Sequence, residues 1–226
     1  MLKWLSYPLS MTAPRPPAIP APELTEFMSI KETGSNVQYL KCYNHTGTHL
    51  DTAAHVLEEG IGITEFRPEE LVYERVRVLD LSGIEDDTVI DKEYLVPYLE
   101  NGDSGEALII RFGVENIRKE EPERFSQHCP GFCPEAAGYI HEKMPNLRMI
   151  GTDVPSIACI AHLNTTMEAH HEFFNRANTE KFLIIEEMKL YTGLTNIRRL
   201  VVSPWLVEGM NSGPCVIWAD VEEDCK

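Results

Sequence analysis

The chain has 226 residues and a formal net charge of −16, from 20 Lys and Arg against 36 Asp and Glu. Its 43% hydrophobic and 25% charged residues are typical of a globular protein and exclude a disordered chain, a collagen and a coiled-coil rod. The acidic balance disfavours nucleic acid and anionic membrane surfaces as partners, because both attract Lys and Arg.

The first 22 residues are rich in proline and form an expected N-terminal arm. The prolines interrupt the apolar core that a signal peptide needs, and no stretch approaches the roughly 20 apolar residues of a membrane span. The arm nevertheless contains large apolar residues, among them Trp4, Leu5, Tyr7, Leu9 and Ile19. Exposed residues of this kind usually mark an interface, so we expect a homodimer or a higher homo-oligomer.

The remaining elements are predicted from periodicity and turn residues. A strand begins near residue 36, where β-favouring side chains recur, and ends in the loop sequence of residues 44–49. Further strands are predicted at 75–81, 107–112, 147–150, 182–188, 200–202 and 215–218. Helices are predicted at 91–99, 134–144 and 168–177. The pattern indicates an α/β protein with a single domain over residues 1–226.

Three histidines and an aspartate lie within eleven residues, in the sequence His45-Thr-Gly-Thr-His49-Leu-Asp51-Thr-Ala-Ala-His55. Imidazole and carboxylate suit zinc and its first-row neighbours, and Gly47 allows the tight backbone that convergent ligands need. Surface polar residues in a loop are the alternative. The density of ligand-type residues favours a metal site.

A second polar cluster follows later, with His170 and His171 ahead of a predicted strand that contains Glu186. In a strand, Phe182, Ile184, Glu186 and Met188 share one face, because side chains alternate with a period of two. A carboxylate on an apolar face is costly to bury without a cationic partner, and a metal ion would supply one. A solvated edge strand is the alternative.

These residues resemble a known family. The pattern over residues 45–55 is similar to the H-x-G-[TA]-H-x-D-x3-H signature of the metal-dependent cyclase-like hydrolases, which include bacterial kynurenine formamidase and isatin hydrolase. Residues 4–10, 151–156 and 167–170 with 185–186 resemble other elements of the family in the same order. The resemblance implies a mixed β-sheet core with flanking helices, in a swivelling β/β/α-like arrangement. It also implies oligomers whose active sites receive residues from a neighbouring subunit.

The resemblance further implies a site with two divalent ions, zinc or manganese. His45, His49 and Asp51 would hold one ion and His170 the second, while Asp51 and Glu186 would bridge them. His55 would be the acid/base group. His171 is the rival of His170, since the sequence alone does not say which of two adjacent imidazoles points inward.

The function that follows is hydrolysis of a C–N bond in a small amide, formamide or cyclic imide by metal-activated water. A lactonase or other ester-type hydrolase is one alternative, and a non-catalytic metal- or ligand-binding protein is another. A free base beside the ligands, here His55, favours catalysis, because a structural site is closed by its ligands.

Three further features have simpler interpretations. His128, Cys129 and Cys133 could hold zinc, but no second pair of ligands accompanies them, which favours an ordinary loop. Asp153 could touch the substrate, although a turn-forming role is simpler. Trp205 and Trp218 are expected to be core or dimer contacts. The six cysteines are too sparse for a disulfide scaffold, so we expect mostly reduced thiols in a cytoplasmic protein, although secreted proteins can also carry six.

Overall fold

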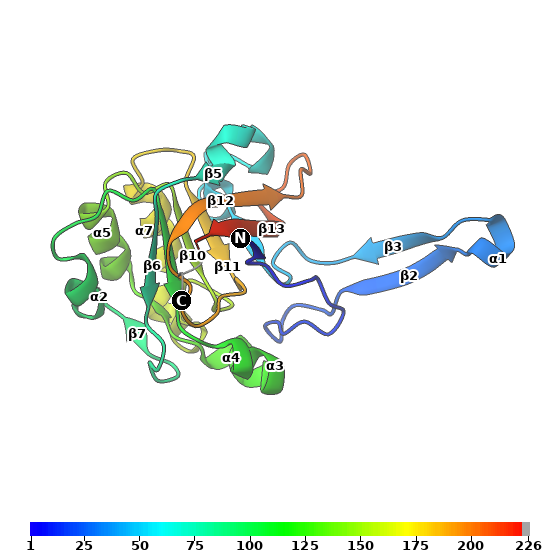
Figure 1. Ribbon diagram of the computed structural model, residues 1–226. Helices are drawn as coiled ribbons and strands as arrows, with labels where there is room; N and C mark the ends of the chain where they lie inside the picture. Colours follow the sequence, from blue (N-terminus) through cyan, green and yellow to red (C-terminus); the bar gives the residue numbers. More distant parts are fainter. Residues whose placement is uncertain (223–226) are drawn as a thin grey trace.

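The computed structural model describes residues 1–222 (Figure 1). Its strands are β1 (Leu2–Trp4), β2 (Glu23–Met28), β3 (Val37–Lys41), β4 (His49–Asp51), β5 (Val72–Tyr73), β6 (Val76–Asp80), β7 (Val89–Ile90), β8 (Ala107–Arg111), β9 (Gly131–Phe132), β10 (Met149–Thr152), β11 (Leu183–Glu186), β12 (Ile197–Pro204) and β13 (Ser212–Val221). Its α-helices are α1 (Ile30–Thr33), α2 (Lys92–Leu99), α3 (Glu115–Glu120), α4 (Pro122–His128), α5 (Pro134–Lys143), α6 (Leu163–Thr166) and α7 (Glu168–Arg176). Short 3₁₀ helices are η1 (Ala53–His55), η2 (Ile63–Glu65), η3 (Pro68–Leu71) and η4 (Ile160–His162).

A mixed nine-stranded sheet dominates the body of the molecule, in the order β5-β12-β13-β4-β11-β10-β8-β6, with β1 added to β13. The strands β6, β8, β10 and β11 run parallel to one another. From β11 the sheet continues through antiparallel pairs to β4, β13, β12 and β5. The change from parallel to antiparallel pairing therefore falls at β11 and β4, near the middle of the sheet.

Two apolar cores lie on the two faces of the sheet. One contains Ile184 and residues of α2, α5 and α7, which cover the outer face (Figure 1). The other contains Leu50, Ile185 and Leu200 from strands on both sides of the switch. The central strands β8 and β11 are buried along their whole length, as expected for strands covered on both faces.

The N-terminal segment lies on the body of the protein. Strand β1 pairs with β13, Ser6 bridges to Met188, and the side chain of Leu5 is completely buried. Tyr7, Leu9 and Ile19 are half-buried, whereas Met1, Leu2 and Trp4 are more than half exposed. The apolar patch expected of residues 1–22 is therefore smaller than predicted, because part of the segment packs on its own sheet.

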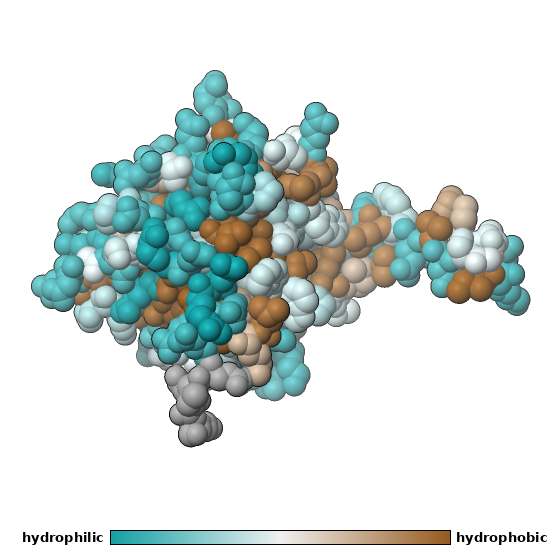
Figure 2. All heavy atoms as spheres, turned by 45° about the horizontal axis from the view of Figure 1, so that its top comes forward, coloured by the Kyte–Doolittle hydropathy of each residue, from teal (hydrophilic) through white to brown (hydrophobic). Residues whose placement is uncertain are grey.

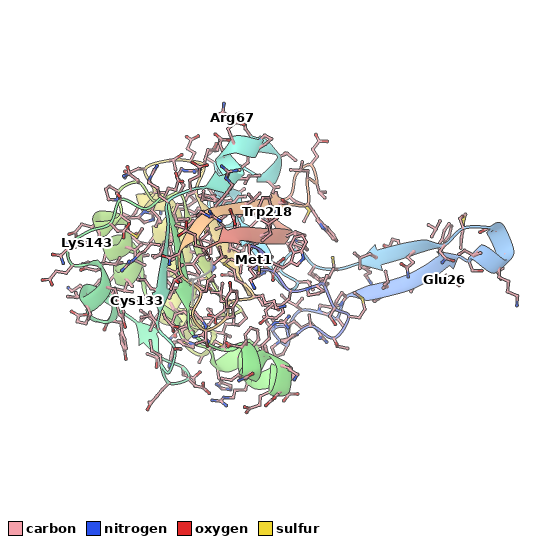
Figure 3. All side chains as sticks on the ribbon, in the orientation of Figure 1. Met1, Glu26, Arg67, Cys133, Lys143 and Trp218 are labelled. Atoms are coloured by element: carbon pink, nitrogen blue, oxygen red, sulfur yellow. The ribbon has the colours of Figure 1, made fainter. Side chains whose placement is uncertain are left out.

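A different segment projects from the body. Strands β2 and β3 form an antiparallel hairpin with α1 at its tip, and the hairpin extends well away from the sheet (Figure 1). We call residues 23–41 the hairpin arm. Every residue of β2 is exposed, including Glu26, which points into solvent in Figure 3. The sequence pattern predicts strand β3 but not its place on an isolated hairpin.

The predicted α/β class, the mixed sheet and the flanking helices are confirmed. All six of the later predicted strands and all three predicted helices are present, within a few residues at each end. The loop assigned to residues 44–49 is wrong at its end, because His49 begins the buried strand β4. The shared face along 182–188 is wrong for Met188, which packs in the other core after the strand ends at Glu186. Among residues 1–222, no helix is long and apolar enough to span a membrane.

Candidate metal centre

The predicted ligands meet where the sheet changes from parallel to antiparallel pairing. His49 and Asp51 are two positions apart on β4, so their side chains leave the same face of the strand. Glu186 ends β11 directly opposite His49. His170 comes from α7, on the outer face of the sheet, and is 4% exposed. Side chains from two strands and one helix therefore converge on one point.

Glu186 lies between two imidazoles. Its Oε2 is 3.0 Å from His49 Nε2, and its Oε1 is 3.3 Å from His170 Nε2. The backbone N–H of Ile157 donates to Oε1 at 2.6 Å, which fixes the orientation of the carboxylate. His49 is held from its other side, since its Nδ1 is 2.8 Å from the carbonyl oxygen of Gly47.

His45 and His55 complete the cluster on its more open side. His45 follows the hairpin arm, and its Nδ1 is 3.4 Å from Asp51 Oδ1. Gly47 has φ of 67°, a left-handed conformation that favours glycine and lets the chain return so that His45 and His49 face each other. The ring centroid of His55 is 4.6 Å from that of His45 and 5.7 Å from that of His170. Both His45 and His55 are half-buried.

Two groups of ligand atoms share Asp51. His45, His49, Asp51 and Glu186 form one group, and Asp51, His55 and His170 form the other. Within each group the candidate ligand atoms lie within 4.8 Å of one another. The structure thus brings together all six residues predicted from the sequence, with His55 among the ligand-type residues of the second group.

The charges within the cluster shift the pKa values of its members. Burial by itself lowers the pKa of His49, but its hydrogen bond to Glu186 and the charges of Asp51 and Glu186 outweigh burial and raise that pKa to about 9. Burial likewise opposes ionisation of Glu186, yet His170 and His49 hold the pKa of Glu186 well below its usual range. Burial and the neighbouring His49 lower the pKa of His45 to about 4 despite the nearby Asp51. His45 is therefore neutral at pH 7, which is the form that binds metal.

The donor set fits a divalent first-row ion. Asp51 is completely buried, and neither of its carboxylate oxygens has a hydrogen-bond partner. His170 Nδ1 is also buried and unpartnered. Leaving a buried carboxylate uncompensated is expensive, whereas imidazole and carboxylate together are the ligands that zinc and manganese accept. The unpartnered carboxylate of Asp51, at the point shared by both ligand groups, fits such an ion.

The other candidate residues lie elsewhere. His171 is half-buried and belongs to neither ligand group, so of the two adjacent histidines it is His170 that faces Glu186. His128 is paired with Asp87 on the surface, and the Cys129 thiol donates to the carbonyl oxygen of Phe125. Neither residue joins a ligand group among residues 1–222, but the segment is not a simple loop, because His128 ends α4 and Gly131–Phe132 form β9. Cys225 lies outside the described residues.

Asp153 has a structural role. It is buried and accepts hydrogen bonds from the backbone N–H groups of Phe112, Gly113 and Val114. Burial still raises the pKa of its carboxyl group to about 6, because these hydrogen bonds offset only part of the desolvation. Asp153 therefore holds the backbone between β8 and α3 in place, which is a structural role other than the local turn that the sequence predicts.

The backbone groups that hold the ligands leave no signal in the sequence. The N–H of Ile157 and the carbonyl oxygen of Gly47 orient Glu186 and His49, but a backbone donor or acceptor is present at nearly every position of any chain. Outer partners of this kind fix the orientation of metal ligands. Only the fold reveals which backbone groups do so.

A protein-family model matches more than half of the chain. A family model described as a putative cyclase matches residues 4–159. A kynurenine formamidase of Bacillus cereus is 32% identical over 145 residues, which is 64% of this chain and 63% of that protein. An uncharacterized protein of Haemophilus influenzae is 29% identical over 115 residues, or 51% of this chain and 80% of that protein. The chain thus spans less than two thirds of the length of the kynurenine formamidase that it matches.

Solved structures with similar folds cover nearly the whole chain. Isatin hydrolase A from Labrenzia aggregata, bound to benzyl benzoate, has a TM-score of 0.82 at 18% identity and covers 99% of this chain and 94% of its own. A structure described as a potential metal-dependent hydrolase with cyclase activity has a TM-score of 0.74 at 20% identity and covers 99% of both chains. At these identities the likeness shows the fold, which confirms the predicted architecture.

Proposed function

Because the chain belongs to the cyclase family, we propose that it is a metal-dependent hydrolase of a C–N bond in a small amide, formamide or cyclic imide. The single observation that carries the proposal is the pair of ligand groups that share the buried, unpaired carboxylate of Asp51. The Bacillus cereus relative is a kynurenine formamidase and the structural neighbour an isatin hydrolase, which supports an acyl–nitrogen bond as the target.

The proposed roles follow the geometry. His45, His49, Asp51, His170 and Glu186 would hold the ions, with Asp51 shared between the two groups. Bound divalent ions supply Lewis acidity, which activates water and polarises a carbonyl oxygen.

Proton transfer is the proposed role of His55. It is half-buried at the open side of the cluster and close to both His45 and His170. We assign it to take the proton of the attacking water and to return that proton to the leaving nitrogen, a task that suits imidazole near neutral pH.

The experiment combines metal analysis with a substrate panel. The purified chain is assayed for zinc and manganese by elemental analysis and then tested on N-formylkynurenine, isatin, simple cyclic imides and lactones, before and after chelation. We expect close to two divalent ions per chain and hydrolysis of at least one C–N substrate that a chelator abolishes. Turnover of lactones alone would support the ester-type alternative. Bound metal with no turnover on any substrate would support a non-catalytic binding protein.

We further propose that the protein is a homo-oligomer, most simply a two-fold dimer, joined through the hairpin arm. Phe27 is 71% exposed, Ile30 64% and Tyr39 60%, and hydrophobic residues gather along the arm in Figure 2. An isolated two-stranded hairpin is marginally stable in water, and exposed apolar patches mark interfaces. A second copy is the simplest partner, because closed two-fold symmetry is the commonest arrangement of soluble oligomers.

The body offers an apolar surface that such an arm could contact. A cavity of about 380 Å³ opens beside the N-terminal segment, and it is lined by Trp4, Tyr7, Leu9, Trp205 and Pro214, among others. Trp4 and Trp205 are both exposed at its rim. We propose that the arm of one protomer packs on this region of the other.

We also propose a cytoplasmic location. Cys42, Cys129, Cys133, Cys159 and Cys215 are free thiols. Free cysteines persist in reducing compartments, whereas oxidising ones favour disulfides.

A further inference from the structure

The residue that follows the ligand Glu186 has an unusual backbone. Glu187 has φ of 54°, in the left-handed region that residues other than glycine rarely adopt, and it is 3% exposed. Such conformations persist only where the surroundings enforce them, and they gather at functional sites. The turn at Glu187 ends β11 and sets the direction in which Glu186 leaves the strand.

Arg118 holds this turn by its side chain. Its Nε donates to Glu187 Oε1 at 2.9 Å, and its guanidinium carbon lies 3.7 Å from the centre of the Tyr7 ring. The Arg118 side chain is 13% exposed, and it comes from α3, beside one end of the sheet (Figure 1). A planar guanidinium stacked on an aromatic ring and bonded to a carboxylate is a rigid arrangement that lysine does not reproduce.

The backbone of Glu187 is tied on both sides. Its N–H donates to the carbonyl oxygen of Val154 at 2.8 Å, and its carbonyl oxygen accepts from Thr48 Oγ1 at 2.6 Å. Thr48 Oγ1 in turn accepts from the N–H of Tyr7 at 2.9 Å. Thr48 directly precedes the ligand His49, so this group of residues connects the ends of the two ligand-bearing strands.

We propose that Arg118 and Glu187 are a positioning pair for the metal centre. The pair fixes the turn after β11, so that the Glu186 carboxylate lies between His49 and His170. Neither Arg118 nor Glu187 belongs to a ligand group, and both act through Glu186. This inference rests on the proposed function, because it assumes that the cluster binds divalent ions.

The chain contains a matched pair that lacks such a connection. Arg148 stacks over the Tyr73 ring at 4.6 Å and is 3.2 Å from Glu106 Oε2. Arg148 directly precedes β10, whereas Val154 and the ligand cluster lie beyond the other end of that strand. It therefore has the same kind of contacts as Arg118, namely an aromatic ring and a carboxylate, at the end of the sheet away from the metal centre.

The test compares Arg118→Met with Arg148→Met in the full chain. Each metal-free protein is titrated with Zn²⁺ and with Mn²⁺ against a chromophoric chelator, and its melting temperature is recorded. Residues that orient metal ligands typically change affinity by about 10- to 100-fold. We expect a loss of that size in Arg118→Met and wild-type affinity in Arg148→Met, even where both lower the melting temperature. Glu187→Gln, which keeps an oxygen for Arg118, should lose less affinity than Arg118→Met and serves as the test if Arg118→Met does not fold.

Amide hydrogen exchange of the metal-free proteins gives a second readout. Exchange over residues 184–188 should be faster in Arg118→Met and unchanged in Arg148→Met. Equal metal affinity in wild type, Arg118→Met and Glu187→Gln would refute the positioning role and leave the proposed function intact. A wild-type chain that binds neither ion would instead refute the proposed function, and the inference with it.

Discussion

Charged side chains are usually exposed and apolar ones buried. The ligand cluster breaks this rule with buried carboxylates, and the hairpin arm breaks it with exposed apolar residues. At the centre of the sheet, Asp51 and Glu186 are buried among apolar strands. On the arm, Phe27 and Ile30 are exposed to water, far from either core. Over most of the body, apolar side chains fill the two cores, and the buried charges Asp153 and Glu187 have hydrogen-bond partners.

The difference indicates two kinds of missing partner. A buried carboxylate without a hydrogen bond requires a cation, because no rearrangement of apolar neighbours can compensate for its lost hydration. Exposed apolar residues on a hairpin favour contact with another apolar surface. The first departure is the basis of the proposed ion site, and the second is the basis of the proposed contact between chains.

The largest expected effect comes from removing the buried charge. Asp51→Asn should leave the site without bound metal and abolish metal-dependent turnover, because Asp51 is shared by both ligand groups. Metal at about 100 times its Kd stabilises a folded protein by about 2.7 kcal/mol, and this stabilisation should be lost.

Asp153→Asn is the matched control, since Asp153 is equally buried but its oxygens accept three backbone hydrogen bonds. It should keep its metal and lose stability, because the amide nitrogen cannot accept from an N–H. Elemental analysis and urea unfolding with and without chelator measure both effects. Retention of metal by Asp51→Asn would contradict the assignment of Asp51 as the shared ligand.

A smaller effect separates catalysis from binding within the cluster. His55→Ala should lower the rate by roughly 10²- to 10⁴-fold, the usual size of a general acid–base contribution, and keep its metal. His171→Ala is the control, because His171 adjoins His170 but belongs to neither ligand group, and it should change neither quantity. Turnover and metal content are measured on the same preparations. If His55→Ala empties the site, His55 is a ligand beside Asp51 and His170.

The ligand cluster could be predicted from the sequence because its chemistry is local. His45, His49, Asp51 and His55 lie within eleven residues, and so dense a set of imidazole and carboxylate groups is typical of a metal site. The partner residues His170 and Glu186 lie far along the chain, and only the family resemblance connects them to the first cluster. The choice between His170 and His171 needed the fold, because which of them points inward depends on how α7 packs against the sheet.

The position of the hairpin arm could not be predicted from the sequence, because it depends on contacts that are not local. Its strand β3 has the composition of a half-buried strand, and nothing in Val37 or Tyr39 indicates that the strand lies on a projecting hairpin with both side chains exposed. The proline-rich composition predicts a projecting arm at residues 1–22 instead, yet Leu5 is in the core and β1 is part of the sheet. Local patterns predict that a residue is buried, but they do not identify the surface that buries it.

The last prediction tests whether the hairpin arm forms the interface, by adding charge at residues that we propose to be buried between chains. The double substitution Phe27→Asp and Ile30→Asp should convert a dimer into a monomer at micromolar concentration, because two carboxylates cannot be buried without partners. The control is Thr25→Asp with Gln38→Asp, which adds the same charge at two exposed polar positions of the hairpin. Both proteins should keep the wild-type far-ultraviolet circular dichroism, since the arm extends away from the body (Figure 1).

Light scattering decides the outcome against the 25.7 kDa mass of one chain. A wild-type mass near that value would refute the oligomer. If the variant with Phe27→Asp and Ile30→Asp is still a dimer, the interface lies on the body and not on the hairpin arm. Deleting residues 1–22 would remove β1 and the buried Leu5, so it does not test the hairpin arm alone. The metal content of the arm variant should equal that of wild type, because none of the six cluster residues lies on the hairpin arm. Loss of turnover with metal retained would then show that the neighbouring chain completes the substrate pocket.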